Sequence, residues 1–129
     1  MPLRAHPDGL HVHQLSAAVS AEVVFLARSF HGPGALPRGD QIVKAALSIT
    51  SNIAEAGGRN TVAEFRQFLG YARGSAFELR SQLLVARSVE PAEQSRIRSL
   101  EGRVTLVIKL LDRLQQNPPP ERRCVHRPR

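Results

Sequence analysis

The sequence predicts an all-α fold, an antiparallel up-down-up-down four-helix bundle. Four segments repeat apolar residues at intervals of three or four, as the helices of a bundle do. No segment alternates apolar and polar residues over the length of a strand. The connections between the last three segments span only about three to six residues, which forces neighbouring helices to run antiparallel. A chain of 129 residues is expected to form one such domain.

The first two helices are expected at residues 12–30 and 40–56. A segment rich in glycine and proline, residues 31–37, separates them. Asp40 is the expected N-cap of the second helix, because its carboxylate can accept hydrogen bonds from free backbone N–H groups of the first turn. Two consecutive glycines, beginning at Gly57, are expected to end this helix.

The last two helices are expected at residues 62–88 and 92–116. Thr61 and Glu64 have the spacing of a capping box, in which each residue satisfies a backbone N–H of the first turn, and they predict the start of the third helix. The fourth helix is expected to end before the three prolines at residues 118–120, which cannot continue it.

The bundle domain is therefore expected at residues 12–116, with residues 1–11 as a flexible N-terminal arm and residues 117–129 as a disordered Pro/Arg-rich tail. The first residues lack the apolar stretch of a secretory signal, and no apolar run approaches the ~18 residues of a membrane span. We therefore expect a cytoplasmic protein with no membrane partner. The single cysteine, Cys124, excludes a disulfide framework and a cysteine-based zinc site.

The chain is strongly basic, and the charge is unevenly distributed. It has 18 Lys and Arg against 11 Asp and Glu, a formal net charge of +7. Residues 1–60 hold five bases and four acids, whereas residues 61–129 hold thirteen bases and seven acids. A basic half of this kind fits a polyanionic partner such as nucleic acid, although coding bias and solubility also account for an excess of arginine.

Five arginines recur at intervals of seven residues, four in the third expected helix and one just before it: Arg59, Arg66, Arg73, Arg80 and Arg87. We call this set the arginine ladder. No carboxylate lies three or four residues from Arg66, Arg73 or Arg80, so their counter-charges must come from another helix, another subunit, solvent or a ligand.

Three interpretations of the ladder remain open. Its arginines form interhelical salt bridges, for instance to Glu22, Glu101 or Asp112; they bind phosphates, for which the guanidinium fork is well shaped; or they bind an acidic protein. In the second case the basic tail adds an electrostatic arm made of Arg122, Arg123, Arg127 and Arg129. The sequence offers no aromatic-lined platform for stacking bases, so binding is expected to depend on shape and charge.

The second expected helix is apolar over more than half of its circumference, which indicates burial on two sides. Its second apolar stripe, together with two glycines opposite the core stripe of the third helix, predicts an interface with another copy of the chain: Val43, Leu47, Thr50, Ala54, Gly70 and Gly74. The alternative is that the loop after the first helix folds over this stripe within one subunit.

Motifs that carry catalysis are absent from the sequence. There is no G-x-S-x-G, no H-E-x-x-H and no glycine-rich phosphate loop ending in Lys and Ser or Thr. A two-metal bundle needs inward Glu-x-x-His pairs on two helices, and no Glu here is followed by His at that spacing. We therefore expect a protein that is not an enzyme and that uses no metal or other cofactor.

The stretch from residue 42 to residue 83 and just beyond resembles the small bacterial four helix bundle protein family, whose founding members are encoded in intervening sequences of the large-subunit ribosomal RNA gene. The matching segments are S-I-T-S-N-I-A-E at residues 48–55, Gly58-Arg59, E-F-x-x-F-L at 64–69, Y-A-R-G-S at 71–75, E-L at 78–79 and Q-L-L-x-A at 82–86.

The resemblance implies an antiparallel bundle that assembles into a ring-like homo-oligomer, a pentamer. It also implies kinship with the accessory proteins of diversity-generating retroelements, which bind a reverse transcriptase and nucleic acid through basic surfaces. Our leading hypothesis is a non-enzymatic, oligomeric bundle that binds RNA or DNA through the arginine ladder. The alternative is an interaction scaffold or accessory subunit that docks a nucleic-acid enzyme such as a reverse transcriptase.

Overall fold

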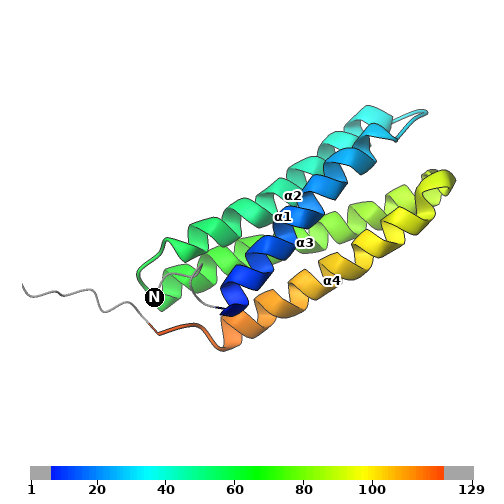
Figure 1. Ribbon diagram of the computed structural model, residues 1–129. Helices are drawn as coiled ribbons and strands as arrows, with labels where there is room; N and C mark the ends of the chain where they lie inside the picture. Colours follow the sequence, from blue (N-terminus) through cyan, green and yellow to red (C-terminus); the bar gives the residue numbers. More distant parts are fainter. Residues whose placement is uncertain (1–6, 121–129) are drawn as a thin grey trace, which may run out of the picture.

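A computed structural model of the chain describes residues 7–120 and confirms the predicted four-helix bundle (Figure 1). The helices are α1 (Pro7–Arg28), α2 (Ala35–Gly57), α3 (Val62–Val89) and α4 (Gln94–Gln116), with a short 3-10 turn, η2 (Pro91–Glu93), directly before α4. No strand is present in this part of the chain. The α1–α2 and α3–α4 connections lie at one end of the elongated bundle, and the α2–α3 connection lies at the other (Figure 1).

A single apolar core holds the four helices together. Helices α1 and α3 each pack against both α2 and α4, so the apolar stripes meet along one central axis. Its fully buried side chains include Val19, Val23 and Leu26 of α1, Ile42, Ile49 and Ile53 of α2, Leu69, Leu79 and Leu83 of α3, and Ile97, Leu100, Leu111 and Leu114 of α4. Each fully buried side chain of this size stabilises the fold by about 1.5–3 kcal/mol, so these stripes dominate the bundle's stability.

Helix α2 begins at Ala35, five residues before the predicted N-cap Asp40, which lies exposed in the second turn. Gly34 is the residue before the helix and has a φ of 78°, a left-handed conformation that glycine adopts without strain. Its carbonyl accepts a hydrogen bond from the Arg38 N–H (3.0 Å). Pro37 was expected to lie in the loop before α2, but it lies in the first helical turn, where a missing N–H costs no helical hydrogen bond.

Helix α1 also extends beyond its predicted start. It runs from Pro7 to Arg28 rather than over residues 12–30, so residues 7–11 belong to the bundle and not to a flexible arm. Asp8 in its first turn pairs with Arg113 of α4 (3.2 Å), which ties this end of α1 to the bundle. Residues 1–6 and 121–129 of the predicted arm and tail lie outside the described residues, whereas Pro119 of the predicted tail is buried.

The predicted start of α3 is confirmed, and that of α4 is shifted by two residues. Thr61 is the N-cap of α3, and its side chain accepts a hydrogen bond from the Glu64 N–H (3.2 Å). Helix α4 begins at Gln94 because the segment from Pro91 to Glu93 forms the 3-10 turn.

Helix α1 is long and apolar enough, by length and composition, to cross a membrane over Asp8–Arg28. This differs from the expectation that no apolar run approaches that length. A core helix of a bundle passes the same test, and α1 has that role here. It buries Val19 and Val23 in the core, and its Glu22 pairs with Arg103 of α4.

A series of hydrogen-bonded polar side chains connects α2 to α3. The Asn52 amide donates to the Ser48 carbonyl (2.9 Å) and lies 3.1 Å from the Ser48 hydroxyl, which in turn contacts the Ser75 hydroxyl (2.8 Å). These residues lie in the segments that carry the family resemblance. Their arrangement indicates that those segments fix the packing of α2 on α3.

Candidate nucleic-acid interface

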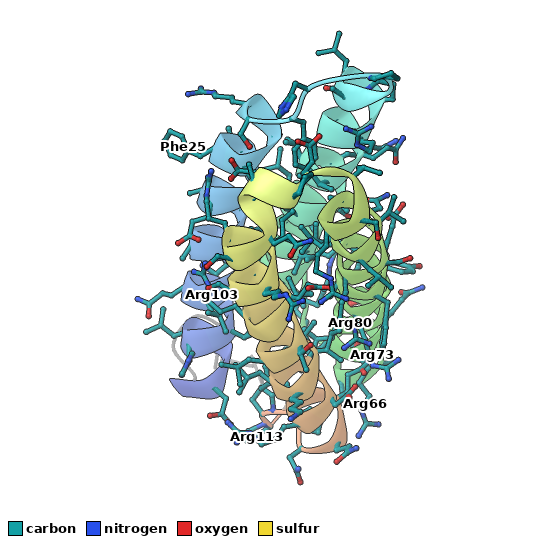
Figure 2. All side chains as sticks on the ribbon, turned by 90° about the vertical axis from the view of Figure 1, so that its right-hand side faces the viewer. Phe25, Arg66, Arg73, Arg80, Arg103 and Arg113 are labelled. Atoms are coloured by element: carbon teal, nitrogen blue, oxygen red, sulfur yellow. The ribbon has the colours of Figure 1, made fainter. Side chains whose placement is uncertain are left out.

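The arginine ladder lies along the edge of α3 that faces α4, where α4 presents a matching row of acceptors. Figure 2 shows Arg80, Arg73 and Arg66 following one another along this edge. The acceptors are Glu101, Thr105, Asp112 and the carbonyl of Gln115. The heptad spacing keeps the four helical arginines on one side of α3, so each of these four meets a different turn of α4.

Three members of the ladder have a carboxylate partner within the subunit. Arg73 Nε donates to Asp112 Oδ1 at 2.5 Å, and Arg87 Nη1 donates to Glu101 Oε1 at 3.2 Å. Arg59, in the α2–α3 connection, pairs with Glu55 at 2.5 Å.

The salt-bridge interpretation of the ladder is therefore correct for Arg73 and Arg87, whose counter-charges come from α4 of the same subunit. The third acid named in that interpretation, Glu22, pairs instead with Arg103 of α4. The hydrogen bond from Arg103 is the main cause that lowers the pKa of the Glu22 carboxyl below 4.5, and its positive charge and that of Arg96 act in the same direction.

Arg66 and Arg80 have no carboxylate partner anywhere in residues 7–120. Arg66 Nε donates to the Gln115 carbonyl (2.9 Å), one of the last carbonyls of α4, which have no partner inside the helix. Arg80 Nη1 donates to the Thr105 hydroxyl (3.2 Å), which donates onward to the Glu101 carbonyl (2.9 Å). Both arginines are thus oriented by α4 without being neutralised by it.

The way in which α4 holds Arg66 and Arg73 leaves part of each guanidinium free for a ligand. In both residues the bond to α4 is made by Nε. The edge formed by Nη1 and Nη2 takes no part in that bond, and it is the edge that can form two parallel hydrogen bonds to a phosphate. Arg66 is exposed and the Arg73 side chain is 42% exposed, so solvent and ligands reach them.

An aromatic side chain, Phe77, lies within the ladder, where the sequence predicted no aromatic-lined platform for stacking bases. The Cζ atoms of Arg73 and Arg80 each lie 4.8 Å from the centroid of the Phe77 ring. Phe77 is 37% exposed. The signal was present in the sequence, because Phe77 follows Arg73 by four residues and precedes Arg80 by three, the spacings that place helical side chains together.

The positive charge is concentrated on one half of the bundle. Helices α3 and α4 carry nine basic and four acidic residues, whereas α1 and α2 carry three basic and four acidic residues. Two further cations of α4, Arg98 and Lys109, have no ion pair within the described part of the chain. They lie three residues from Glu101 and Asp112 respectively, so they border the same edge as the ladder. The predicted tail contacts Arg122 and Arg123 lie outside the described residues.

The residues predicted to form a subunit interface do not all lie on one surface: Val43 and Leu47 line a groove beside α1, whereas Gly70 and Gly74 are on α3. Thr50 is bonded inside the subunit, since its hydroxyl lies 3.0 Å from that of Ser20 on α1. Val43 packs against the core, while Ala54 is half-buried and Leu47 is 51% exposed. On α3, a Cβ added at Gly70 would meet Gln115 of α4 at 3.5 Å, and one added at Gly74 would meet nothing within 4 Å. Thr50 is therefore covered by α1 itself and not by the loop after α1 that the alternative names.

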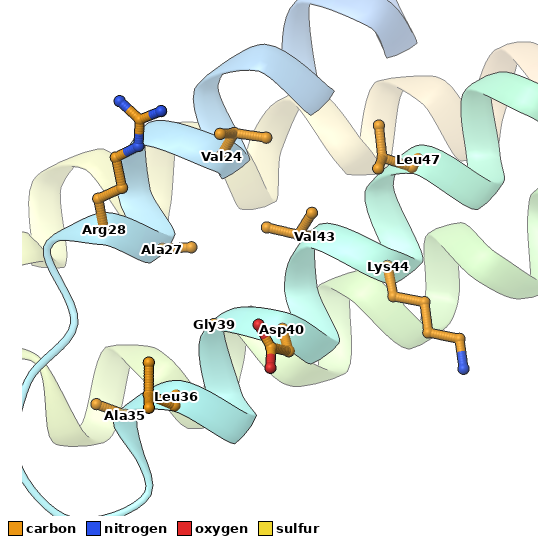
Figure 3. Close-up of a pocket in the computed structure, with 10 residues that line it drawn as sticks. All are labelled: Val24, Ala27, Arg28, Ala35, Leu36, Gly39, Asp40, Val43, Lys44 and Leu47. Atoms are coloured by element: carbon orange, nitrogen blue, oxygen red, sulfur yellow. The ribbon is translucent and has the colours of Figure 1, made fainter.

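An apolar groove of about 580 Å³ lies between the C-terminal half of α1 and the N-terminal half of α2. Figure 3 shows Val24 and Ala27 of α1 opposite Val43 of α2, with Leu47 farther along α2. Charged side chains, including Arg28 and Lys44, line its rim (Figure 3). The groove is on the helix pair that does not carry the ladder.

Residues 7–120 contain no candidate metal site. No three His, Cys, Asp or Glu side chains gather there in a group that could hold a metal ion.

Comparisons with known proteins bear on the fold and the family. The sequence profile of the 23S rRNA-intervening sequence protein family matches residues 8–113. The chain is also similar to a crystal structure of a protein of unknown function from the S23 ribosomal protein family of Bacteroides thetaiotaomicron VPI-5482. The TM-score is 0.75 at 22% sequence identity, and the match covers 85% of this chain and 99% of that one. At this identity the likeness shows the fold alone. No curated protein matches the chain.

Proposed function

The chain belongs to the 23S rRNA-intervening sequence protein family, and on this premise we propose that it is a non-enzymatic, oligomeric bundle that binds RNA or DNA through the face formed by α3 and α4. The observation that carries the proposal is the pair of oriented but uncompensated arginines, Arg66 and Arg80, on the helix pair that holds nine basic and four acidic residues. A polyanion is the ligand that such a face attracts.

The salt bridges of the ladder are compatible with phosphate binding. Partly exposed ion pairs contribute only about 0–1 kcal/mol each, because water already solvates both charges. Arg73 can keep its Nε on Asp112 while its Nη edge contacts a phosphate. The ion pairs therefore act mainly to orient the guanidiniums, and Arg66, Arg73 and Arg80 are the residues that we assign to phosphate.

A pair of matched double variants tests this proposal. R66Q/R80Q removes two uncompensated charges from the α3–α4 face, and R28Q/K44Q removes two charges from the α1–α2 face. Neither Arg28 nor Lys44 has an ion pair in residues 7–120. Because both line the rim of the α1–α2 groove, the two variants are compared after light scattering has shown that they have the same particle mass. Fluorescence anisotropy with labelled RNA and DNA oligonucleotides should show weaker binding for R66Q/R80Q only. Equal losses in both variants, or no binding by the unmodified protein, would overturn the proposal.

Self-association is part of the same proposal. Leu36 and Leu47, which line the α1–α2 groove, are 82% and 51% exposed, which is unfavourable in water unless another surface covers them. A second copy of the chain is the partner that we propose, and the resemblance favours a ring of five. Such a ring places several α3–α4 faces in one particle, which raises the affinity for a long polyanion through multivalency.

A protein-interaction scaffold is the second candidate function. Leu84, Val85 and Val89, near the C-terminal end of α3, are each about half exposed and lie next to the basic face. An apolar surface next to a basic surface can dock a protein that itself carries nucleic acid, such as a reverse transcriptase. Affinity capture from lysate treated with nuclease separates the two functions, because only a direct protein partner is retained after that treatment.

A further inference from the structure

We propose that the ligand of the α3–α4 face is single-stranded nucleic acid, and that Phe77 stacks on one of its bases while Arg66, Arg73 and Arg80 contact the flanking phosphates. This inference rests on the proposed function and names its ligand class. It depends on two features of the structure: the straight course of the ladder and the position of Phe77 within it.

The ladder follows one edge of α3 over a distance at which the backbone of a duplex already curves away from a straight line. From Arg66 to Arg80 the row spans fourteen residues, about 21 Å along α3 at ~1.5 Å per residue. Each strand of a duplex winds once around the axis in about 34–36 Å, so its phosphates leave a straight row after roughly half of that length. A single strand has no fixed winding and can follow the whole row.

Phe77 provides a surface for bases at the middle of the row. Phe77 is 37% exposed and is not part of the buried core. The guanidiniums of Arg73 and Arg80 lie over its ring, so a base stacks on Phe77 by taking the place of one of them as that arginine turns to a phosphate. Every base has a flat π-face that stacks on an aromatic ring, and single-strand binding proteins combine such rings with a positively charged groove. In a duplex these faces are hidden in the base stack, so Phe77 can stack only on an unpaired base.

A merely structural role of Phe77 makes a different prediction. If the ring only holds the guanidiniums of Arg73 and Arg80 in place, its removal weakens the binding of every polyanion alike. If it stacks on a base, its removal weakens the binding of single strands and leaves the binding of a chain of phosphates without bases unchanged. Inorganic polyphosphate is the ligand that separates these two roles.

The chain contains no tryptophan, which makes a direct optical test possible. F77W introduces the only tryptophan, which can be excited apart from the single tyrosine, at the proposed stacking position. F25W is the matched control, because Phe25 is 59% exposed on α1, away from the ladder, and has its own arginine, Arg28, at 5.3 Å (Figure 2). Single-stranded RNA and DNA should quench the emission of F77W and leave that of F25W unchanged, and polyphosphate should quench neither. A difference in quenching between single-stranded RNA and single-stranded DNA identifies which of the two nucleic acids the α3–α4 face prefers.

Affinity measurements with F77L and F25L complete the test. F77L should bind single strands about tenfold more weakly, with the same salt dependence, unchanged polyphosphate binding and an unchanged melting temperature. F77Y, which keeps a ring, should retain the affinity. F25L should bind as the unmodified protein does.

The following results would overturn the inference: a duplex that binds at least as tightly as the single strand, an equal loss of polyphosphate binding in F77L, or equal effects of F77L and F25L. In each of these cases the α3–α4 face still binds a polyanion, so the proposed function stands. If neither strand form binds the unmodified protein, the proposed function fails together with the inference.

Discussion

Arg38 and Glu90 form a buried ion pair that joins the start of α2 to the junction between α3 and α4. Arg38 Nη2 lies 2.6 Å from Glu90 Oε2, and the Glu90 side chain is only 1% exposed. The second guanidinium nitrogen, Nη1, donates to the Pro33 carbonyl (2.7 Å), and the backbone N–H of His31 donates to Glu90 Oε2 (3.3 Å). The pair therefore gathers the α1–α2 and α3–α4 connections at one end of the bundle.

Removal of the Glu90 carboxylate is expected to destabilise the bundle. In E90A the Arg38 guanidinium loses its counter-charge in a largely buried position, which costs about 3 kcal/mol. Urea unfolding followed by circular dichroism measures the loss. E78Q, which changes an exposed carboxylate of α3, should alter the free energy of unfolding by less than about 0.5 kcal/mol. Equal stability of E90A and E78Q would contradict this account of the pair.

The Glu22–Arg103 pair predicts a pH-dependent contribution to stability. The hydrogen bond from Arg103 lowers the pKa of Glu22 below its ordinary value of 4.5, so the folded state binds this proton less readily than the unfolded chain does. The stability that the pair contributes is therefore fully present above pH 4.5, and it is lost as the pH falls through the lowered pKa of Glu22.

The variant E22Q tests this sign. It should be less stable than the unmodified protein at neutral pH, by less than about 1 kcal/mol because the pair is partly exposed, and the difference should disappear in acid. Urea unfolding at both pH values measures it. A difference that grows as the pH falls would contradict the assignment.

Removal of the Asp112 carboxylate should strengthen nucleic-acid binding. In D112N the Arg73 guanidinium loses its counter-ion, so the α3–α4 face gains one unit of positive charge at the proposed contact. Anisotropy titrations should give a lower Kd, and the slope of log K against log salt should steepen by up to ~0.7 for a single strand. D40N makes the same charge change on α2 and serves as the control. If D112N does not exceed D40N in affinity, Asp112 does not limit binding at the ladder.

A charge in the α1–α2 groove should disrupt self-association. L47K places an ammonium group at a half-exposed groove position, where a partner subunit would have to desolvate it. Light scattering coupled to size-exclusion chromatography should report a smaller particle with unchanged helix content. L106K, at a 42% exposed position on α4, should leave the mass unchanged. An unaltered mass for L47K would place the subunit contact elsewhere.

Much of the fold is predictable from the sequence because its signals are local. The start of α3 follows from the Thr61 side chain and the backbone of Glu64, three residues apart, and the core stripes follow from helical periodicity. The start of α2 was mispredicted because Pro37 and the preceding glycines are typical of loops. Whether they belong to a loop or a first helical turn depends on the backbone conformation of Gly34.

The candidate site is less predictable because its contacts depend on the register between two helices. Periodicity places the ladder on one side of α3, but the partners of Arg73 and Arg87 are set by how α4 is aligned with it. For the same reason Glu90, which lies past the end of α3, is buried by residues more than fifty positions away.

The salt dependence of binding tests the central claim most directly, namely that the uncompensated arginines of α3 contact phosphates. The measurement is the slope of log K against log salt for the unmodified protein and for R66Q/R80Q with the same single-stranded oligonucleotide. Loss of two phosphate contacts should reduce the magnitude of the slope by about 1.4, while R28Q/K44Q keeps it unchanged. An identical slope for R66Q/R80Q and the unmodified protein would show that neither arginine contacts a phosphate.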